Sequence, residues 1–429
     1  MKRGNNITLG RVAGIWLPAI VGTMFFALCS CSAGSGAGDS TAVIEDTLSV
    51  RVMEGEADLT GAALDYADSI LNQMSVEEKV GMMFMPAVYS KSGEEDMDLM
   101  MRYARELHVG GLVLLKGDLE SVAAIADTLR TLPGAGYFLG VDAENGLRMR
   151  FPDAPEFPWS LELGRLEDDQ LLYEFGREIS RECREAGINM VLGPVMDIVP
   201  GEGSHGLMRK RSLGSDPKRV ADLALAYARG VEDGNVISVA KHFPGHGSSS
   251  ADSHKRLGII RSPRNVLDSI DLYPFRRYAE EGLSGIMVGH LSVAALDPEL
   301  RPAVASSRIM NTLLREQLGF RGLILTDALN MEGAMGVKGY QAVLAGADIV
   351  IAPTNTEREI NEMIKAAERG ELPADIINDR CRRILFYKYI MGVNSKERID
   401  PATVVDRVGS NADNIRDVLR RSKNSILYR

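Results

Sequence analysis

The chain has 429 residues, of which 45% are hydrophobic and 25% are charged, and its formal net charge is −10. This composition excludes a disordered chain, and the length is enough for one large α/β domain or two smaller ones. The excess of acidic residues argues against a nucleic-acid-binding protein, which usually carries a basic face.

The N-terminus has the layout of a secretory signal peptide. A basic start precedes an apolar run at residues 12–28, which is short for a membrane span and is followed by small residues that favour cleavage. Residues 28–31, Leu-Cys-Ser-Cys, resemble the bacterial lipobox, in which the last cysteine is lipidated and becomes the mature N-terminus. By this resemblance residues 1–30 are a lipoprotein signal peptide and Cys31 is the lipid anchor.

Residues 31–62 are rich in Gly, Ser, Thr and acidic residues, a composition typical of a flexible tether. We therefore expect a lipoprotein of a bacterial cell envelope, held to a membrane and facing the periplasm or the outside. Cys183 and Cys381 then remain as thiols in segments with a helical pattern. A disulfide between them stays open, but two buried, inert thiols are favoured.

From about residue 63 the chain alternates short apolar, β-prone runs with longer amphipathic segments. Continuous apolar runs are typical of strands covered on both faces, as in a parallel sheet with helical crossovers. Residues 171–185 and 218–231 have apolar positions three and four apart and are predicted helices. The eight predicted strands are Val80–Pro86, Gly111–Leu115, Tyr137–Asp142, Asn189–Pro194, Val236–Lys241, Gly285–His290, Leu323–Thr326 and Ala347–Ile351.

Eight such units fit an α/β fold of the (β/α)8, TIM-type barrel class, with a doubly wound open sheet as the alternative. Polar residues at the ends of different strands favour the barrel, because a barrel brings all of these ends to one mouth. We predict one catalytic domain at residues 63–392 and a C-terminal helical extension at 393–429, with its last helix at 411–427. The polar residues concerned are Asp142, Asp197, residues 241–254, His290 and Asp327.

Residues 241–254 hold three of the six histidines, a lysine and an aspartate in a loop that leaves a buried strand. This density points to chemistry rather than to packing. A metal site is one alternative, but Pro244 and Gly245 prevent the helix that would put His242 and His246 on one face. Acid/base use is therefore favoured. Asp327, which directly follows a predicted strand, is from position alone either a helix N-cap or a catalytic carboxylate.

Six motifs in the same order and spacing resemble glycoside hydrolase family 3, and within it the single-domain β-N-acetylglucosaminidase branch. The resemblance covers about residues 70–392. The motifs are Gly140–Arg150, Gly193–Asp197, Arg211–Pro217, Lys241–Gly247, Asp252–His254 and Thr326–Met331.

The resemblance implies that Asp327 is a nucleophile that forms a covalent glycosyl-enzyme. It also implies that His254 is the acid/base and that Asp252 orients it. Imidazole titrates near pH ~6.5 and can both give and take a proton, and a neighbouring aspartate can fix its tautomer. The residues implied to hold the sugar are Asp142, Arg150, Arg211, Lys241 and His242.

Other residues near these motifs receive lesser roles. We expect Glu144 and Asp197 to support the barrel mouth and His246 to support the loop turn, while His290 matches a family histidine near the site. The sequence departs from the branch at three positions, Ala328, Asn145 and Leu147. Ala328 removes a negative charge beside the nucleophile, and the other two put the leaving-group side of the specificity in doubt.

These observations predict a retaining, exo-acting β-N-acetylglucosaminidase that removes terminal β-linked N-acetylglucosamine from peptidoglycan fragments, such as muropeptides, or from related glycans. No metal or organic cofactor, no nucleic acid and no partner subunit are expected; the partners are a carbohydrate substrate and, through the lipid, a membrane. One alternative is a phosphorylase, because a neutral histidine repels phosphate less than a carboxylate does. The other is a non-catalytic glycan-binding lipoprotein on the same barrel.

Overall fold

The computed structural model describes residues 57–90, 94–199, 208–246 and 257–421, which all belong to one unit of the chain, residues 45–429. The predicted signal peptide, the lipid anchor Cys31 and nearly all of the tether lie outside the described residues. So do Asp252 and His254.

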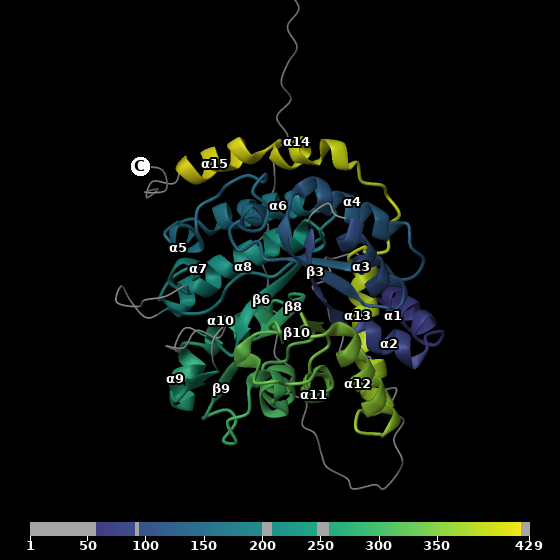
Figure 1. The fold of residues 1–429 in the computed structure, drawn as a ribbon. Coiled ribbons are helices and arrows are strands. Elements are labelled where there is room, and N and C mark those ends of the chain that lie inside the picture. Colours follow the sequence, from purple (N-terminus) through teal and green to yellow (C-terminus); the bar gives the residue numbers. More distant parts are fainter. Residues whose placement is uncertain (1–56, 91–93, 200–207, 247–256, 422–429) are drawn as a thin grey trace, which may run out of the picture. The chain divides into compact units, whose positions relative to one another are not determined.

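The described residues are built around parallel strands that alternate with helices (Figure 1). Seven strands pair in the order β10-β8-β6-β5-β4-β3-β2, and β1 pairs in parallel with β11. Two short strands, β7 and β9, form a separate parallel pair. The bounds are β1 Phe84–Met85, β2 Ala87–Ser90, β3 Gly111–Gly117, β4 Phe138–Val141, β5 Met190–Val191, β6 Ile237–Phe243, β7 Gly258–Ile260, β8 Gly285–Val288, β9 Leu291–Val293, β10 Leu323–Thr326 and β11 Val350–Ile351.

Backbone hydrogen bonds close these strands into a barrel. Pro86 divides the first strand, so that β1 bonds to β11 while β2 bonds to β3. The Val350 N–H donates to the Met83 carbonyl at 2.8 Å, and the Thr326 N–H donates to the Ile349 carbonyl at 3.0 Å, which joins β11 to β10. The predicted (β/α)8 barrel is confirmed.

One strand boundary was predicted wrongly. Residues 80–82 belong to helix α2 (Val76–Met82), and the first strand begins only at Phe84. Ser75 and Glu78 form a capping box that starts this helix, since the Ser75 hydroxyl accepts from the Glu78 N–H and the Glu78 carboxylate accepts from the Ser75 N–H. The apolar residues that suggested a strand are the buried face of the helix's last turn.

The helices cover the outside of the strands (Figure 1). The two predicted helices are confirmed as α6 and α8, which begin after the N-caps Asp168 and Asp216. The longer helices are α1 Ala57–Leu71, α3 Glu94–Arg105, α4 Leu119–Arg130, α6 Asp169–Glu185, α8 Pro217–Asp233, α10 Leu272–Glu280, α12 Thr356–Glu368, α13 Ala374–Ile390 and a π-helix, Arg308–Gln317. The shorter ones are α5 Ser160–Leu163, α7 Met208–Arg211, α9 Arg264–Ser269, α11 Gly339–Ala345 and 3-10 turns at 147–149, 303–305, 332–334 and 401–403.

Buried polar groups lie among the amino ends of the strands. Asp348, fully buried just before β11, accepts hydrogen bonds at 2.6 Å from both Arg315 and Arg383. Glu232 at the end of α8 accepts from the Ser238 hydroxyl at 2.6 Å and from the Ser284 N–H at 2.8 Å. These carboxylates tie helices to strand starts, a structural role typical of this face of a barrel.

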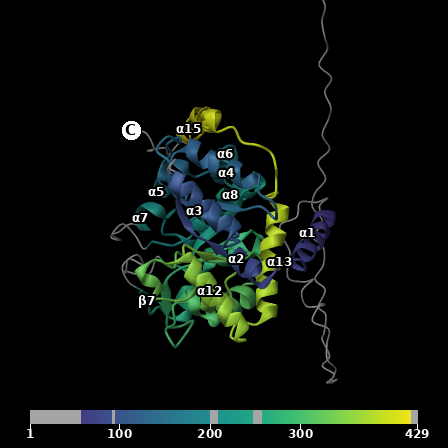
Figure 2. The same cartoon turned by 45° about the vertical axis from the view of Figure 1, so that its right-hand side comes forward.

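The last described part of the chain packs against earlier helices. Residues 391–400 lead into α14 (Val404–Gly409), which packs on α4 and α6, and then into α15 (Ala412–Arg421). The predicted last helix is confirmed up to Arg421, and its remainder lies outside the described residues. Figure 2 shows α1 beside α13, where an Asp68–Arg382 pair joins them at 2.6 Å.

Cys183 and Cys381 are both buried and free, as the sequence favoured. Within the described ranges, no helix is both long and apolar enough to cross a membrane.

Candidate active site

The predicted site residues within the described ranges gather where the strands end. Asp142 directly follows β4, Lys241 and His242 lie near the end of β6, and Asp327 directly follows β10. Because the strands are parallel and closed into a barrel, these positions share one mouth.

Lys241 is the centre of the charged network at this mouth. Its side chain comes from the buried strand β6 and is only 1% exposed. The ammonium Nζ lies 2.6 Å from Asp142 Oδ1 and 2.8 Å from Glu144 Oε1. Arg150 pairs with the other oxygen of Asp142. Two carboxylates thus compensate the buried ammonium, which would otherwise be costly to remove from water.

Glu144 also binds Arg211 through both of its carboxylate oxygens. Arg211 Nη2 lies 2.7 Å from Glu144 Oε1, and Arg211 Nε lies 2.9 Å from Oε2. Burial alone would raise the pKa of Glu144, but the charges of Lys241 and Arg211 outweigh it and hold that pKa below its ordinary value. Burial likewise opposes ionisation of Asp142, but the charges of Lys241 and Arg150 outweigh it and lower the pKa of Asp142. Both carboxylates therefore stay ionised at neutral pH.

His242 is oriented by a buried aspartate. Its Nδ1 lies 2.7 Å from Asp197 Oδ2, while its Nε2 lies 3.4 Å from Arg211 Nη2. Asp197 Oδ1 accepts the backbone N–H of His246. If Nδ1 carries the proton and donates it to Asp197, Nε2 is left as an acceptor on the side of Arg211. Asp197 thereby fixes both the imidazole and the turn that follows β6.

Asp327 is held at the end of β10 by its backbone and its own side chain. Its N–H donates to the Val288 carbonyl at 2.8 Å, and its Oδ1 accepts from the Ala328 N–H at 2.8 Å. Burial alone would raise its pKa, but the charges of His242 and His290 are the largest of several effects that outweigh it. The pKa of Asp327 is therefore lowered. Asp327 is therefore an ionised carboxylate at neutral pH, with Lys241 contributing to its lowered pKa.

Two further residues shape the mouth and were not found from the sequence. The buried Tyr227 hydroxyl donates to the Ala143 carbonyl at 2.9 Å, which holds the loop between Asp142 and Glu144. The Ser212 hydroxyl donates to the Asp197 carbonyl at 2.7 Å. The position of Ser212 next to Arg211 in a motif was a readable signal, whereas Tyr227 looked like any apolar helix position.

The structure brings together all the predicted sugar-binding residues and the predicted nucleophile. The expected support role of Glu144 and Asp197 agrees with their contacts. His246 is buried, and neither of its ring nitrogens has a partner in the part of the chain that the structure describes. His290 Nε2 donates to the Ala328 carbonyl, 2.9 Å away, next to Asp327. In the same described ranges, no group of three or more His, Cys, Asp or Glu side chains is placed to hold a metal ion.

This arrangement suits one kind of chemistry. Asp327 is a fixed, ionised carboxylate, while Asp142, Lys241 and Arg211 offer charged groups and His242 a polar ring nitrogen for a polar substrate. A carboxylate so placed can attack an electrophilic carbon or stabilise a developing positive charge. Polar groups around it can hold a molecule rich in hydroxyl groups.

Sequence comparisons point in the same direction. A family model described as the glycosyl hydrolase family 3 N terminal domain matches residues 75–386. A beta-hexosaminidase from Nitrosospira multiformis is 34% identical over 284 residues, which cover 62% of this chain and 79% of that protein. A beta-hexosaminidase from Methylobacillus flagellatus is 32% identical over 288 residues, covering 63% of this chain and 80% of that protein.

Solved structures share the fold. A glycoside hydrolase family 3 beta-N-acetylglucosaminidase from Paenibacillus sp. str. FPU-7 matches with a TM-score of 0.70 at 28% identity, covering 78% of this chain and 68% of that one. A beta-glucoside phosphorylase, BglX, matches with a TM-score of 0.76 at 19% identity, covering 85% of this chain and 69% of that one. At that identity the second likeness concerns the fold alone.

Proposed function

The chain belongs to glycosyl hydrolase family 3, and on this basis we propose that it is a retaining, exo-acting β-N-acetylglucosaminidase. It is a glycoside hydrolase that acts on O-glycosyl bonds. Relatives named beta-hexosaminidase, at 32–34% identity, support N-acetylhexosaminide as the substrate class. The observation that carries the proposal is the position of Asp327 at the barrel mouth, directly after β10, where its surroundings lower its pKa and keep it ionised.

In the proposed reaction, Asp327 attacks the anomeric carbon as the bond to the leaving oxygen breaks. His254 gives its proton to that oxygen, and the sugar becomes bound to Asp327 as an ester. Water then attacks the anomeric carbon while His254 takes its proton, so the sugar leaves with its configuration retained. The roles of His254 and Asp252 rest on the sequence resemblance, since both lie outside the described residues.

The charged network gives the chain a way to hold the terminal sugar. Lys241 and Arg211 are fixed donors, and Asp142 is a fixed acceptor, so none of them loses much freedom when a hydroxyl group replaces water. We propose that these residues, with Arg150 and His242, grip the non-reducing N-acetylglucosamine. On sequence grounds, the proposal also includes peptidoglycan fragments as the natural substrate. It further includes a lipid anchor at Cys31 that holds the protein in a bacterial envelope.

The central test compares wild type with Asp327→Ala on a chromogenic β-N-acetylglucosaminide. We expect the variant to lose nearly all turnover while it still binds N-acetylglucosamine in calorimetry. Unchanged turnover would refute the nucleophile assignment. Running the wild type in phosphate and in a non-phosphate buffer, with product analysis, separates hydrolysis from phosphorolysis. Phosphate dependence with a sugar 1-phosphate product would refute the assignment as a hydrolase. No turnover of any N-acetylglucosaminide would refute the proposal that the protein is an N-acetylglucosaminidase.

A second test addresses the acid/base. His254→Ala should slow glycosylation by substrates with poor leaving groups far more than by substrates with activated aryl groups, because the latter need no proton. Equal slowing of both classes would remove His254 from the acid role.

A further inference from the structure

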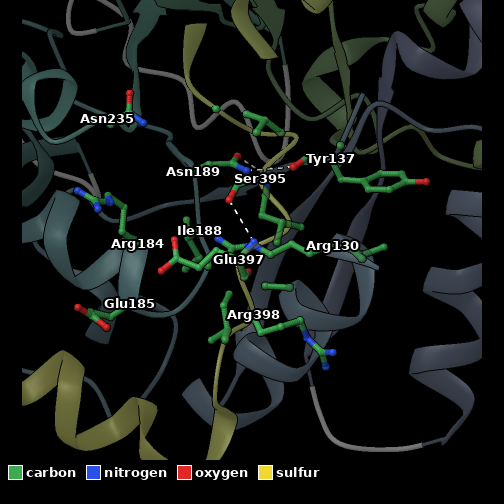
Figure 3. A pocket seen from close by; sticks show the side chains of 18 of the residues that line it. Arg130, Tyr137, Arg184, Glu185, Ile188, Asn189, Asn235, Ser395, Glu397 and Arg398 are labelled. Atoms are coloured by element: carbon green, nitrogen blue, oxygen red, sulfur yellow. Dashed lines mark hydrogen bonds between the residues drawn. The ribbon is translucent and has the colours of Figure 1, made fainter. Parts of the chain in front are cut away.

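A cavity of about 480 Å³, shown in Figure 3, is lined by residues that come just before strands of the barrel, at the end opposite to the candidate active site. Tyr137, Asn189 and Asn235 line it, and they precede strands β4, β5 and β6 respectively. The candidate active site uses the carboxyl ends of these strands. The other wall of the cavity is the segment 391–400, which crosses this end of the barrel before α14.

The lining of the cavity carries more positive than negative side chains. Its cationic residues are Arg130, Arg181, Arg184, Lys396, Arg398 and Arg407, and its acidic residues are Glu185, Glu397 and Asp400. Three of the cations are already ion-paired: Arg181 with Glu178, Arg398 with Asp127 and Arg407 with Glu185. Asp400 is engaged too, since its carboxylate caps the 3-10 turn that follows.

Of the three other cations, Lys396 donates to the Leu132 carbonyl at 2.5 Å, which leaves Arg130 and Arg184. Arg130, half-buried at the end of α4, donates through Nη1 to the Glu397 carbonyl at 2.6 Å. Arg184, near the end of α6, has only a 3.5 Å contact with the Gly234 carbonyl. Neither has a carboxylate ion pair among residues 57–421 as far as the structure describes them. Figure 3 shows the two on opposite sides of Glu397.

The surroundings of these arginines favour an anion. Burial lowers the pKa of Arg130, and the charges of Glu397 and Asp127 offset this effect only in part. Guanidinium groups bind carboxylates and phosphates through paired hydrogen bonds. Leu129, Leu139 and Ile188 add an apolar portion to the lining, and the volume lies within the range of small-molecule sites.

We propose that this cavity binds a small molecule with at least two phosphate or carboxylate groups, held between Arg130 and Arg184. Such a ligand contacts α4, α6 and the segment 391–400 together, so its binding fastens the C-terminal extension to the barrel. The site is separate from the catalytic mouth and needs no part of the proposed reaction.

Thermal unfolding of the full chain with added pyrophosphate or citrate tests the proposal, with sodium chloride adjusted to keep ionic strength constant. We expect a saturable rise in melting temperature with at least one of the two anions, and the stronger one identifies whether phosphate or carboxylate is preferred. Each variant's shift is taken relative to its own melting temperature without anion, because Arg130→Gln also loses the bond to Glu397.

Variants at the cavity should change affinity in both directions. Arg130→Gln and Arg184→Gln should each weaken binding about tenfold, the loss expected for one charge-assisted contact. Glu397→Gln should strengthen it by removing a facing negative charge. Arg308→Gln, at an exposed arginine far along the chain, is the matched control and should bind as wild type does. Turnover of the chromogenic substrate should be the same in all four.

Two results would overturn the site. One is the absence of a saturable shift with either anion in the wild type. The other is an equal shift in the wild type, in Arg130→Gln and in Arg184→Gln. Neither result bears on Asp327 or on the glycosidase activity, which are read out by turnover.

Discussion

Replacing Glu144 by Gln removes one charge from the centre of the mouth while keeping the side chain's shape. Glu144 is buried and compensates both Lys241, at 2.8 Å, and Arg211, at 2.7 and 2.9 Å. The amide can accept only through one oxygen, and its NH2 group faces a cation. Removing one partner of a buried charged pair costs about 3–5 kcal/mol, because the other charge stays buried without compensation.

The remaining Asp142 partly neutralises Lys241, so we expect the lower end, a loss of about 3 kcal/mol in the free energy of unfolding. At about 2–4 °C per kcal/mol this is a fall in melting temperature of roughly 6–12 °C. Since Lys241 and Arg211 are then free to reorient, kcat/KM on a chromogenic β-N-acetylglucosaminide should fall by about 100-fold or more, as expected for misplaced binding groups.

The assay is urea unfolding of the folded variant together with steady-state kinetics. Glu156→Gln is the control, since Glu156 is 77% exposed and pairs with Arg148 only at 3.6 Å. It should change the unfolding free energy by no more than about 0.5 kcal/mol. If Glu144→Gln behaves like this control in both assays, the argument that Glu144 holds the two cations in place is wrong.

Three further changes have definite expected outcomes. Asp348→Asn should lower the free energy of unfolding in urea by about 3–5 kcal/mol, because it leaves Arg315 and Arg383 without their shared carboxylate. The kcat of the folded enzyme should stay near wild type, and an unchanged urea midpoint would contradict the expected loss. Arg211→Lys cannot keep both bonds to Glu144, so KM should rise about tenfold with kcat less affected, and an unaltered KM would argue against a sugar contact. Burial raises the pKa of Glu232 to about 7, so the stability that this group contributes should be fully present below pH 4.5 and be lost as pH rises through 7. Glu232→Gln keeps the acceptor oxygen but cannot ionise, so between pH 5 and pH 8 it should lose about 2 kcal/mol less stability than the wild type in thermal melts. The same pH dependence in the variant and the wild type would refute the raised pKa of Glu232.

The barrel and the location of its mouth were predictable, because apolar runs and strand-end polar residues are local features of the sequence. The split of the first strand was not. Pro86 marks a break, yet only the closed barrel decides that β1 bonds to β11 and β2 to β3. The capping box at Ser75 and Glu78 was readable in the sequence but was outweighed by the apolar run that follows it.

The candidate site was predictable as a list of residues and less so as a network. Motifs supplied Asp142, Lys241 and Arg211, but nothing local says that one glutamate compensates two cations, one from a strand and one from a helix. Those contacts depend on distances between residues up to 97 positions apart along the chain. The cavity beside Arg130 escaped the sequence for the same reason, since the segment 391–400 that walls it looks like an ordinary polar linker.

The closure of the barrel by β11 also bears on how the chain reaches this structure. Phe84 pairs with Val350, so a strand near the start of the domain finds one of its neighbours only after more than 260 further residues have been made. Until then the outer edges of β1 and β10 have no partner, and such edges invite pairing with other chains. Contacts this distant in sequence slow folding, and large domains commonly pass through intermediates. A nascent chain that stops before residue 351 should therefore be prone to aggregate, and helix α13, which packs on α1, joins the start of the domain to its end only after the barrel can close.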